Sequence, residues 1–214
     1  MNIVLLTAFE PFNGYHYNVT QQIVEELNGV EIENFVVRGI VLPVSFKRAR
    51  QELLSTLKEM KPRIVVGMGM APRATKVIVE LAAHNVAFST VPDNDGYAPQ
   101  GEFLEGENLV VMPTRMPLHT ILHRCVKEMK LPIVFSMTVG SYLCNLAAYT
   151  IHRYLNENNG VGGFIHLPPS TDLAMRMKLD TYLPKKVLVD CVLCIVRSCI
   201  EELKQCYSPW THSW

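Results

Sequence analysis

The chain has 214 residues, half of them hydrophobic (49%), and its 20 basic side chains balance 20 acidic ones. That length suits one domain or two small ones, with enough apolar residues for a substantial core. The neutral balance argues against nucleic acid or an anionic membrane as the main partner, and no apolar run reaches the roughly 18 to 20 residues that span a bilayer. The apolar N-terminus lacks a basic region and a cleavage site, so it is predicted to be a core strand rather than a signal peptide.

The predicted elements alternate between apolar, strand-like runs and helical patterns. In chain order they are a strand at 2–9, a helix at 18–29, a strand at 35–44, a helix at 45–62, strands at 63–70 and 76–88, a surface loop at 90–108, a helix at 117–130, a strand at 133–139, a helix after 140, a strand at 162–168 and a helix at 185–207. Ser45 is the predicted N-cap of its helix, and Pro62 follows the end of that helix. This alternation predicts an α/β layer structure with a mainly parallel sheet, and no repeat or linker divides it, so residues 1–214 are predicted to form a single domain.

The cysteines do not have the dense spacing of a disulfide framework, although there are six of them. Cys191, Cys194 and Cys199 crowd one apolar segment, a usage that fits a reducing cytoplasm. Cys191 and Cys194 form a C-x-x-C, but it lies inside an apolar helix without turn residues. We therefore favour a core position or a subunit contact over a redox or zinc role.

Unusual residues follow four of the predicted strands, in the segments FEPF, GMGMAPR, VGSYLC and IHLPP. In open α/β sheets, sites form beyond the carboxyl ends of strands. If these strands are parallel neighbours, all four segments meet at one edge of the sheet. Cys144, His166, Phe9 and Phe12 would then share one cleft.

Cys144 lies in the first turn of its predicted helix, where free N–H groups and the helix dipole favour a thiolate nucleophile. The alternative is a buried apolar cysteine, which is the commoner role. His166 interrupts an apolar strand, either as a core histidine or as a general base for Cys144. Glu80 also interrupts an apolar run, and it is the best candidate to orient the imidazole; otherwise it is an edge-strand side chain facing water.

Two further signals are weaker. His119 and His123 have the helical i, i+4 spacing of metal ligands, but no third ligand stands out, so an exposed helix face is the favoured interpretation. The glycine-rich segment GMGMAPR lacks the Lys-Ser/Thr of a phosphate loop, which argues against nucleotide binding.

Five segments in order resemble the motifs of one family, pyroglutamyl peptidase I, also called pyrrolidone-carboxylate peptidase. They are LLTAFEPFNG with a downstream Asn18, VELAAHN, VPDNDGYAP, SMTVGSYLCN and GFIHLP. The resemblance covers nearly the whole chain. It implies a three-layer α/β/α sandwich and a cysteine exopeptidase that removes an N-terminal pyroglutamyl residue through a thioester acyl-enzyme, with no metal or other cofactor.

The resemblance also implies roles for individual residues. Cys144 corresponds to the nucleophile, His166 to the base and Glu80 to the residue that orients it. The positions that line the substrate pocket in relatives are Phe9, Phe12, Asn18, Met70, Tyr142 and Leu143. A pyroglutamyl ring is a neutral lactam, which calls for flat apolar walls and backbone polar groups rather than an acidic anchor. The implied partners are pyroglutamylated peptides and, more weakly, further copies of the chain in a homotetramer.

The chain departs from the family pattern at four positions. Ala8 and Asn13 replace glycines, Val139 replaces an alanine, and Thr90 stands where the family commonly has Arg. Two alternatives follow: a cysteine hydrolase for another small acyl or amide group, or a non-catalytic protein that binds pyroglutamyl ends. An intact set of Cys144, His166 and Glu80 argues against the second.

Overall fold

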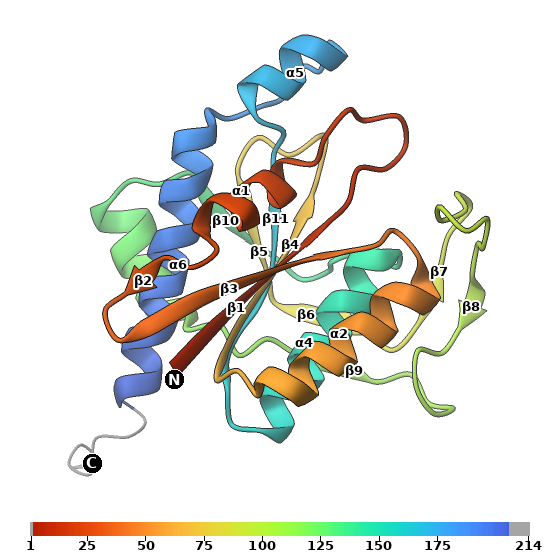
Figure 1. The fold of residues 1–214 in the computed structure, drawn as a ribbon, viewed down its shortest axis with the longest axis horizontal. Coiled ribbons are helices and arrows are strands. Elements are labelled where there is room, and N and C mark those ends of the chain that lie inside the picture. Colours follow the sequence, from red (N-terminus) through yellow and green to blue (C-terminus); the bar gives the residue numbers. More distant parts are fainter. Residues whose placement is uncertain (1, 206–214) are drawn as a thin grey trace.

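The structure, a computed structural model, describes residues 2–205, and its centre is a twisted seven-stranded sheet (Figure 1). The strand order is β10-β5-β11-β4-β1-β3-β2. Four central strands are mutually parallel: β3 (Phe35–Leu42), β1 (Asn2–Phe9), β4 (Ile64–Met70) and β11 (Val161–Leu167). The others run the opposite way: β5 (Val77–Glu80) and β10 (Ile133–Ser136) beyond β11, and the short β2 (Glu31–Ile32) at the other edge.

Helices cover both faces of this sheet. One face carries α1 (Val19–Leu27), α6 (Lys185–Gln205) and the π-helix η1 (Ile121–Glu128), which continues the short α3 (Leu118–Thr120). The other face carries α2 (Phe46–Met60) and α4 (Leu143–Glu157). The predicted α/β/α sandwich with a mainly parallel, mixed sheet is confirmed.

Side-chain alternation along β1 shows why both faces are covered. Val4, Leu6 and Ala8 point into the core beneath α1 and α6, whereas Leu5 and Phe9 point into the core beneath α2 and α4. Successive side chains of a strand point to opposite faces, so an apolar run without alternation is buried on both. That pattern requires the two helical layers.

The predicted strand at 76–88 is wrong as a single element. Only β5 joins the main sheet, and the chain then forms β6 (Ala82–His84) and β7 (Ala87–Phe88). These pair with β9 (Val111–Pro113) and with β8 (Gln100–Glu102), respectively. The predicted loop at 90–108 therefore contains one short strand. The sequence prediction also omitted α5 (Thr171–Met177), whose N-cap is Ser170.

The expectation that four parallel strands end at one edge is also wrong for one of them. β10 is parallel to β5, which is antiparallel to β11, so β10 does not end at the edge where β4 and β11 end. Residues 137–142 lie between β10 and α4, and Gly140 adopts a φ of 85° there. A positive φ is accessible to glycine without a steric penalty, so this segment can turn before the helix starts.

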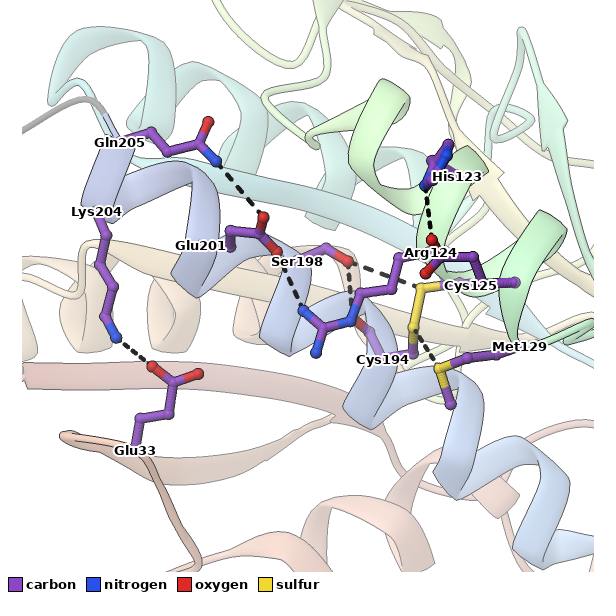
Figure 2. A network of polar contacts seen from close by, with 11 residues as sticks. Glu33, His123, Arg124, Cys125, Met129, Cys194, Ser198, Glu201, Lys204 and Gln205 are labelled. Carbon is purple, nitrogen blue, oxygen red and sulfur yellow. Dashed lines mark hydrogen bonds and ion pairs between the residues drawn. A yellow bond between two sulfur atoms is a disulfide. The ribbon is translucent and has the colours of Figure 1, made fainter. Parts of the chain in front are cut away.

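A disulfide joins Cys125 of η1 to Cys194 of α6, a bond that the sequence analysis did not predict (Figure 2). Cys194 is the second cysteine of the C-x-x-C, and it bonds to a cysteine 69 residues away in the sequence rather than to Cys191. Cys144, Cys191 and Cys199 are free, and Cys206 lies outside the described residues. The ion pair between Arg124 and Glu201 joins the same two helices at 3.1 Å.

Removal of the disulfide should destabilise the fold. A cross-link closing a loop of this length typically contributes about 2–5 kcal/mol, because it restricts the unfolded chain. Replacing Cys125 and Cys194 by Ala together should lower the unfolding free energy by about that amount in denaturant titrations. A reducing agent should lower the stability of the wild type but leave the double variant unchanged. Cys191→Ala, at a buried free thiol of the same helix, is the control that should keep the response to reductant. A wild type that ignores reductant would contradict the prediction.

Candidate active site

Cys144 is the second residue of α4, and its thiol is partly exposed. The helix begins at Leu143 after Tyr142, whose carbonyl accepts hydrogen bonds from the N–H groups of Asn145 and Leu146. The N–H groups of Leu143 and Cys144 itself belong to the first turn, where no intrahelical carbonyl is available. The cysteine therefore lies in the positive field of a helix N-terminus, as the sequence predicted.

His166 and Glu80 form a buried pair on neighbouring antiparallel strands. The ring Nδ1 of His166 lies 2.7 Å from Oε1 of Glu80, with 12% and 2% of the two side chains exposed. Glu80 pairs in register with Phe164, two residues before His166. The interpretation of Glu80 as a water-facing edge residue is therefore wrong. Glu80 lies on β5, which runs antiparallel to β11, and the sequence did not predict this antiparallel neighbour.

The nucleophile and the histidine converge over Gly69 of β4. A Cβ atom at position 69 would lie 2.7 Å from Sγ of Cys144 and 3.2 Å from Nε2 of His166. Contacts below 3.0 Å are not found for real Cβ atoms, so only glycine leaves room for both groups. Three strands and one helix thus bring Cys144, His166 and Glu80 to one place.

The electrostatics of this group favour a charged histidine. Burial alone lowers the pKa of His166, but its interactions with Cys144 and then with Glu80 outweigh burial and raise the pKa to about 10. His166 is therefore protonated near neutral pH. A neighbouring imidazolium favours the thiolate form of a cysteine, which is the nucleophilic form.

A cavity of about 260 Å³ opens beside Cys144. This is below the ~300–1,000 Å³ typical of pockets for drug-sized ligands, so it suits a small group. All six residues predicted to bind substrate line it, and they are Phe9, Phe12, Asn18, Met70, Tyr142 and Leu143. The remaining lining residues are Glu10, Asn13, Tyr15, Val44 and Pro72.

Aromatic rings form one wall of this cavity. The rings of Phe12 and Tyr142 lie 5.5 Å apart, and Tyr142 contacts the edge of Phe46 at 5.3 Å. The hydroxyl of Tyr142 donates to the carbonyl of Pro92 at 3.2 Å, while burial, Asp93 and Cys144 raise its pKa to about 12. Tyr142 is therefore a neutral, fixed wall of the cavity.

Asn18 lines the cavity but uses its side-chain oxygen elsewhere. Its Oδ1 accepts hydrogen bonds from the N–H of Thr20 at 3.0 Å and from the Thr20 hydroxyl at 2.8 Å. This is the N-cap of α1, which satisfies donors that a helix leaves free. Only its amide nitrogen remains for a ligand, and that lies 3.5 Å from the carbonyl of Glu10.

Two carboxylates that sequence reasoning did not single out hold the loop beside the cavity. Asp93 accepts hydrogen bonds from the N–H groups of Phe46, Asp95 and Tyr97. Glu10 accepts from the N–H of Val44 and from the amide of Asn94 through the same oxygen. The signal for Asp93 was its place in a Pro-Asp-Asn segment flanked by glycine, which is typical of a turn whose side chain bonds to nearby backbone.

Two asparagines from the recognised motifs have similar anchoring roles. Asn145, adjacent to Cys144, bonds to both backbone groups of His84 and to the carbonyl of Val86. Asn85 bonds to the backbone of residues 105 and 108. Both residues are buried. Asn145 ties the start of α4 to β6 and the residues after it, and Asn85 ties the segment between β6 and β7 to residues 105–108.

The departures from the family pattern fall into two groups. Asn13 has a φ of 55°, a left-handed conformation that asparagine tolerates better than most residues do, so it can replace glycine there. Ala8 and Val139 are buried in the two cores. Thr90, where the family commonly has Arg, is exposed.

His119 and His123 do not gather metal ligands. Their rings stack with centroids 6.4 Å apart, and Nδ1 of His123 lies 3.1 Å from the carboxylate of Glu128. The side chain of His123 is 61% exposed. Within residues 2–205, no group of three or more His, Cys, Asp or Glu side chains is placed to hold a metal ion. The exposed helix face predicted for the pair agrees with this geometry.

Comparisons with known proteins match most or all of the chain. A family model for pyroglutamyl peptidase matches residues 2–205. The pyrrolidone-carboxylate peptidase of Thermococcus litoralis is 38% identical over 174 residues, which cover 80% of this chain and 79% of the relative. That of Saccharolobus islandicus is 37% identical over 185 residues, covering 83% and 88%. Among solved structures, the pyrrolidone carboxyl peptidase from Thermococcus litoralis aligns over 100% of both chains, with a TM-score of 0.89 and 30% identity.

Proposed function

The chain belongs to the pyroglutamyl peptidase family, and from that premise we propose that it is a cysteine exopeptidase that removes an N-terminal pyroglutamyl residue from peptides. The observation that carries the proposal is the convergence of a helix-start thiol and a protonated, carboxylate-bound histidine beside a small apolar cavity. This is the arrangement of an activated nucleophile with its base and orienting acid.

In the proposed mechanism, Cys144 is the nucleophile, His166 the acid and base, and Glu80 the residue that orients His166. Sγ of Cys144 attacks the carbonyl carbon of the pyroglutamyl residue, and the oxyanion that forms lies near the N–H groups at the start of α4. His166 gives its proton to the leaving amine as the C–N bond breaks, which leaves a thioester. His166 then takes a proton from water, the resulting hydroxide attacks the thioester, and Cys144 leaves as the thiolate with free pyroglutamate.

The cavity supports a lactam substrate through its shape and polarity. A five-membered lactam is flat and uncharged, so it can lie against Phe12 and Tyr142 without desolvating an ion. Phe9 and Met70 offer further apolar surface, and the amide nitrogen of Asn18 offers one donor. Leu143, at the first position of α4, lines the cavity next to the nucleophile.

Three other parts of the proposal rest on the family resemblance or on composition. They are a single domain over residues 1–214, assembly as a homotetramer, and a cytoplasmic location. None of the helices within residues 2–205 combines the length and apolar character needed to cross a membrane. The disulfide between Cys125 and Cys194 weighs against the cytoplasmic location, because cytosolic disulfides are usually transient. Alkylation of denatured protein from freshly lysed cells would show whether the pair is oxidised in the cell.

The function is tested by release of an amine fluorophore from its pyroglutamyl amide, with prolyl and glutaminyl amides as competitors. We expect the pyroglutamyl amide to react with a kcat/KM well above those of the other two. A preference for either competitor would instead favour a hydrolase for another small acyl group. A pyroglutamyl peptide that mass spectrometry finds bound but uncleaved would favour a binding protein.

Phe12 offers the cleaner test of the cavity wall, because Phe9 is also a buried core residue with only 4% of its surface exposed. Phe12→Ala should raise KM for the pyroglutamyl amide by roughly 5- to 150-fold, since one lost apolar face contributes about 1–3 kcal/mol. We expect kcat to change much less. Phe103→Ala, at an exposed phenylalanine outside the lining of this cavity, is the matched control and should leave KM unchanged. An unchanged KM in Phe12→Ala would place the substrate elsewhere.

A further inference from the structure

One carboxylate lines the cavity but has no part in the proposed mechanism. Glu10 directly follows β1, is half-buried, and stands between the lining residues Phe9 and Phe12 in the sequence. It is unusual there, because the other described lining residues with ionisable side chains are Cys144 and two tyrosines. A pyroglutamyl ring is uncharged, so this carboxylate calls for an explanation other than an ion pair with the substrate.

Glu10 is held in place through its backbone and through one side-chain oxygen. Its N–H donates to the carbonyl of Leu42 at 3.0 Å, and its own carbonyl lies 3.5 Å from the amide nitrogen of Asn18. Its Oε1 accepts hydrogen bonds from the N–H of Val44 at 2.8 Å and from the amide of Asn94 at 2.9 Å. Val44 also lines the cavity, so these bonds fix the carboxylate against the cavity wall.

The other oxygen of this carboxylate is unused. Within residues 2–205, Oε2 of Glu10 makes no hydrogen bond and no ion pair. It is also absent from the buried side-chain atoms of that range that lack a partner, so it keeps accessible surface. A carboxylate oxygen accepts hydrogen bonds and donates none. Oε2 is therefore a fixed acceptor that a ligand in the cavity can use.

A lactam ring needs one acceptor and one donor from the protein. It is a cis amide, so its N–H and C=O lie on the same edge of the ring, and both lose water on entering an apolar cavity. Asn18 can supply the donor, because its Oδ1 is bonded to Thr20 and its amide nitrogen remains. That nitrogen lies beside the backbone carbonyl of Glu10. Donor and acceptor thus come from neighbouring residues of one wall.

The remaining polar side chains of the lining are weaker acceptors than Oε2 of Glu10. Asn13 is exposed, so water competes for its amide. The hydroxyl of Tyr142 is bonded to the carbonyl of Pro92. Tyr15 offers a hydroxyl oxygen, and hydrogen bonds to a carboxylate are stronger than those to a hydroxyl.

We propose that Oε2 of Glu10 accepts a hydrogen bond from the lactam N–H of the pyroglutamyl ring, which makes Glu10 a specificity-determining residue. This role rests on the proposed function, because it names a contact of the same substrate. A ring of the same shape without the N–H strips water from Oε2 and gives nothing in return. Such a ring should react about 10- to 100-fold less efficiently than the lactam.

Glu10→Gln removes the proposed acceptor and keeps the contacts that hold the side chain. Both partners of Oε1, the N–H of Val44 and the amide of Asn94, are donors, so the oxygen of the glutamine amide takes that position. The NH₂ group then stands where Oε2 was and faces the lactam N–H with a second donor. We expect kcat/KM for the pyroglutamyl amide to fall about 10- to 100-fold, mostly through KM.

The matched substrate is the 3-oxocyclopentanecarboxylic amide of the same fluorophore, in which CH₂ replaces the ring N–H and the ring carbonyl stays. Glu10→Gln should reduce the preference for the lactam over this analogue to within about threefold. A purely structural role of Glu10 would slow both substrates alike and leave their ratio unchanged. Asn94→Ala is the control, because it removes one bond to Oε1 but leaves Oε2, and it should keep most of the wild-type ratio.

A binding assay separates this proposal from the proposed activity. If the wild type cleaves neither amide, the activity fails, and binding of 2-pyrrolidone and of cyclopentanone, followed by NMR shifts of the protein, still tests Glu10. We expect Glu10→Gln to weaken binding of 2-pyrrolidone alone. The proposal is overturned if Glu10→Gln keeps the wild-type ratio in the kinetic assay or in the binding assay. It is also overturned if the wild type prefers a prolyl amide and Glu10→Gln loses that preference, because Glu10 would then bind an ammonium group.

Discussion

Cys144→Ser should lower kcat for a pyroglutamyl amide by roughly 10³-fold or more, with the fold unchanged. A hydroxyl is a much weaker nucleophile than a thiol near neutral pH. Sulfur and oxygen differ little in volume, so the substrate should still bind and KM should stay near its wild-type value. Stopped assays with a long incubation can measure the residual rate.

The other free cysteines provide matched controls for this variant. Cys191 and Cys199 are buried in α6, and burial raises the pKa of both thiols, Cys191 to about 12. Neither is therefore a thiolate near neutral pH, and Cys191→Ser and Cys199→Ser should keep wild-type kcat in folded protein. A loss in either that matches the loss in Cys144→Ser would identify a different active thiol.

Glu80→Gln should lower kcat by roughly 10²- to 10⁴-fold while KM changes much less. The amide cannot stabilise the imidazolium, and it can present an N–H to Nδ1 of His166, which favours the wrong tautomer. The sign of the pH effect follows from the same contact. Glu80 helps to raise the pKa of His166 to about 10, so loss of its charge should lower that pKa. The alkaline limb of the kcat/KM profile should move to lower pH.

Glu80→Asp separates charge from reach, because it keeps the carboxylate and shortens the side chain. We expect its kcat to fall between the wild type and Glu80→Gln, with an alkaline limb closer to that of the wild type. If Glu80→Gln keeps the wild-type rate and pH profile, Cys144 and His166 act as a pair and the carboxylate has no part in orientation.

The local pattern of the sequence located much of this site. Glu80 and His166 stood out because each interrupts an apolar run, and the structure places the buried Glu80 in contact with the largely buried His166 at 2.7 Å. Cys144 stood out because glycine and a strand-like run precede its helix, and it does lie at the helix start. The catalytic roles of these three residues remain predictions.

The features that could not be predicted from the sequence depend on contacts between residues that are far apart in the chain. The direction of β10 is not encoded in its four residues, since parallel and antiparallel strands with buried faces look alike. Cys125 and Cys194 pair across 69 residues, and spacing alone does not reveal such connectivity.

β11 follows the other described strands in the sequence, so it is synthesised after them, and this order has a consequence for the nascent chain. Glu80 and His166 are 86 residues apart, and Cys144 is synthesised before the histidine that activates it. Until β11 docks between β4 and β5, the thiol has neither an imidazolium beside it nor a carboxylate behind it. We expect a nascent or unfolded chain to carry an ordinary cysteine that iodoacetamide alkylates slowly at neutral pH, and refolding to accelerate that reaction. The reactive thiol thus exists only in molecules whose sheet is complete, which shields the ribosome-bound chain from adventitious oxidation.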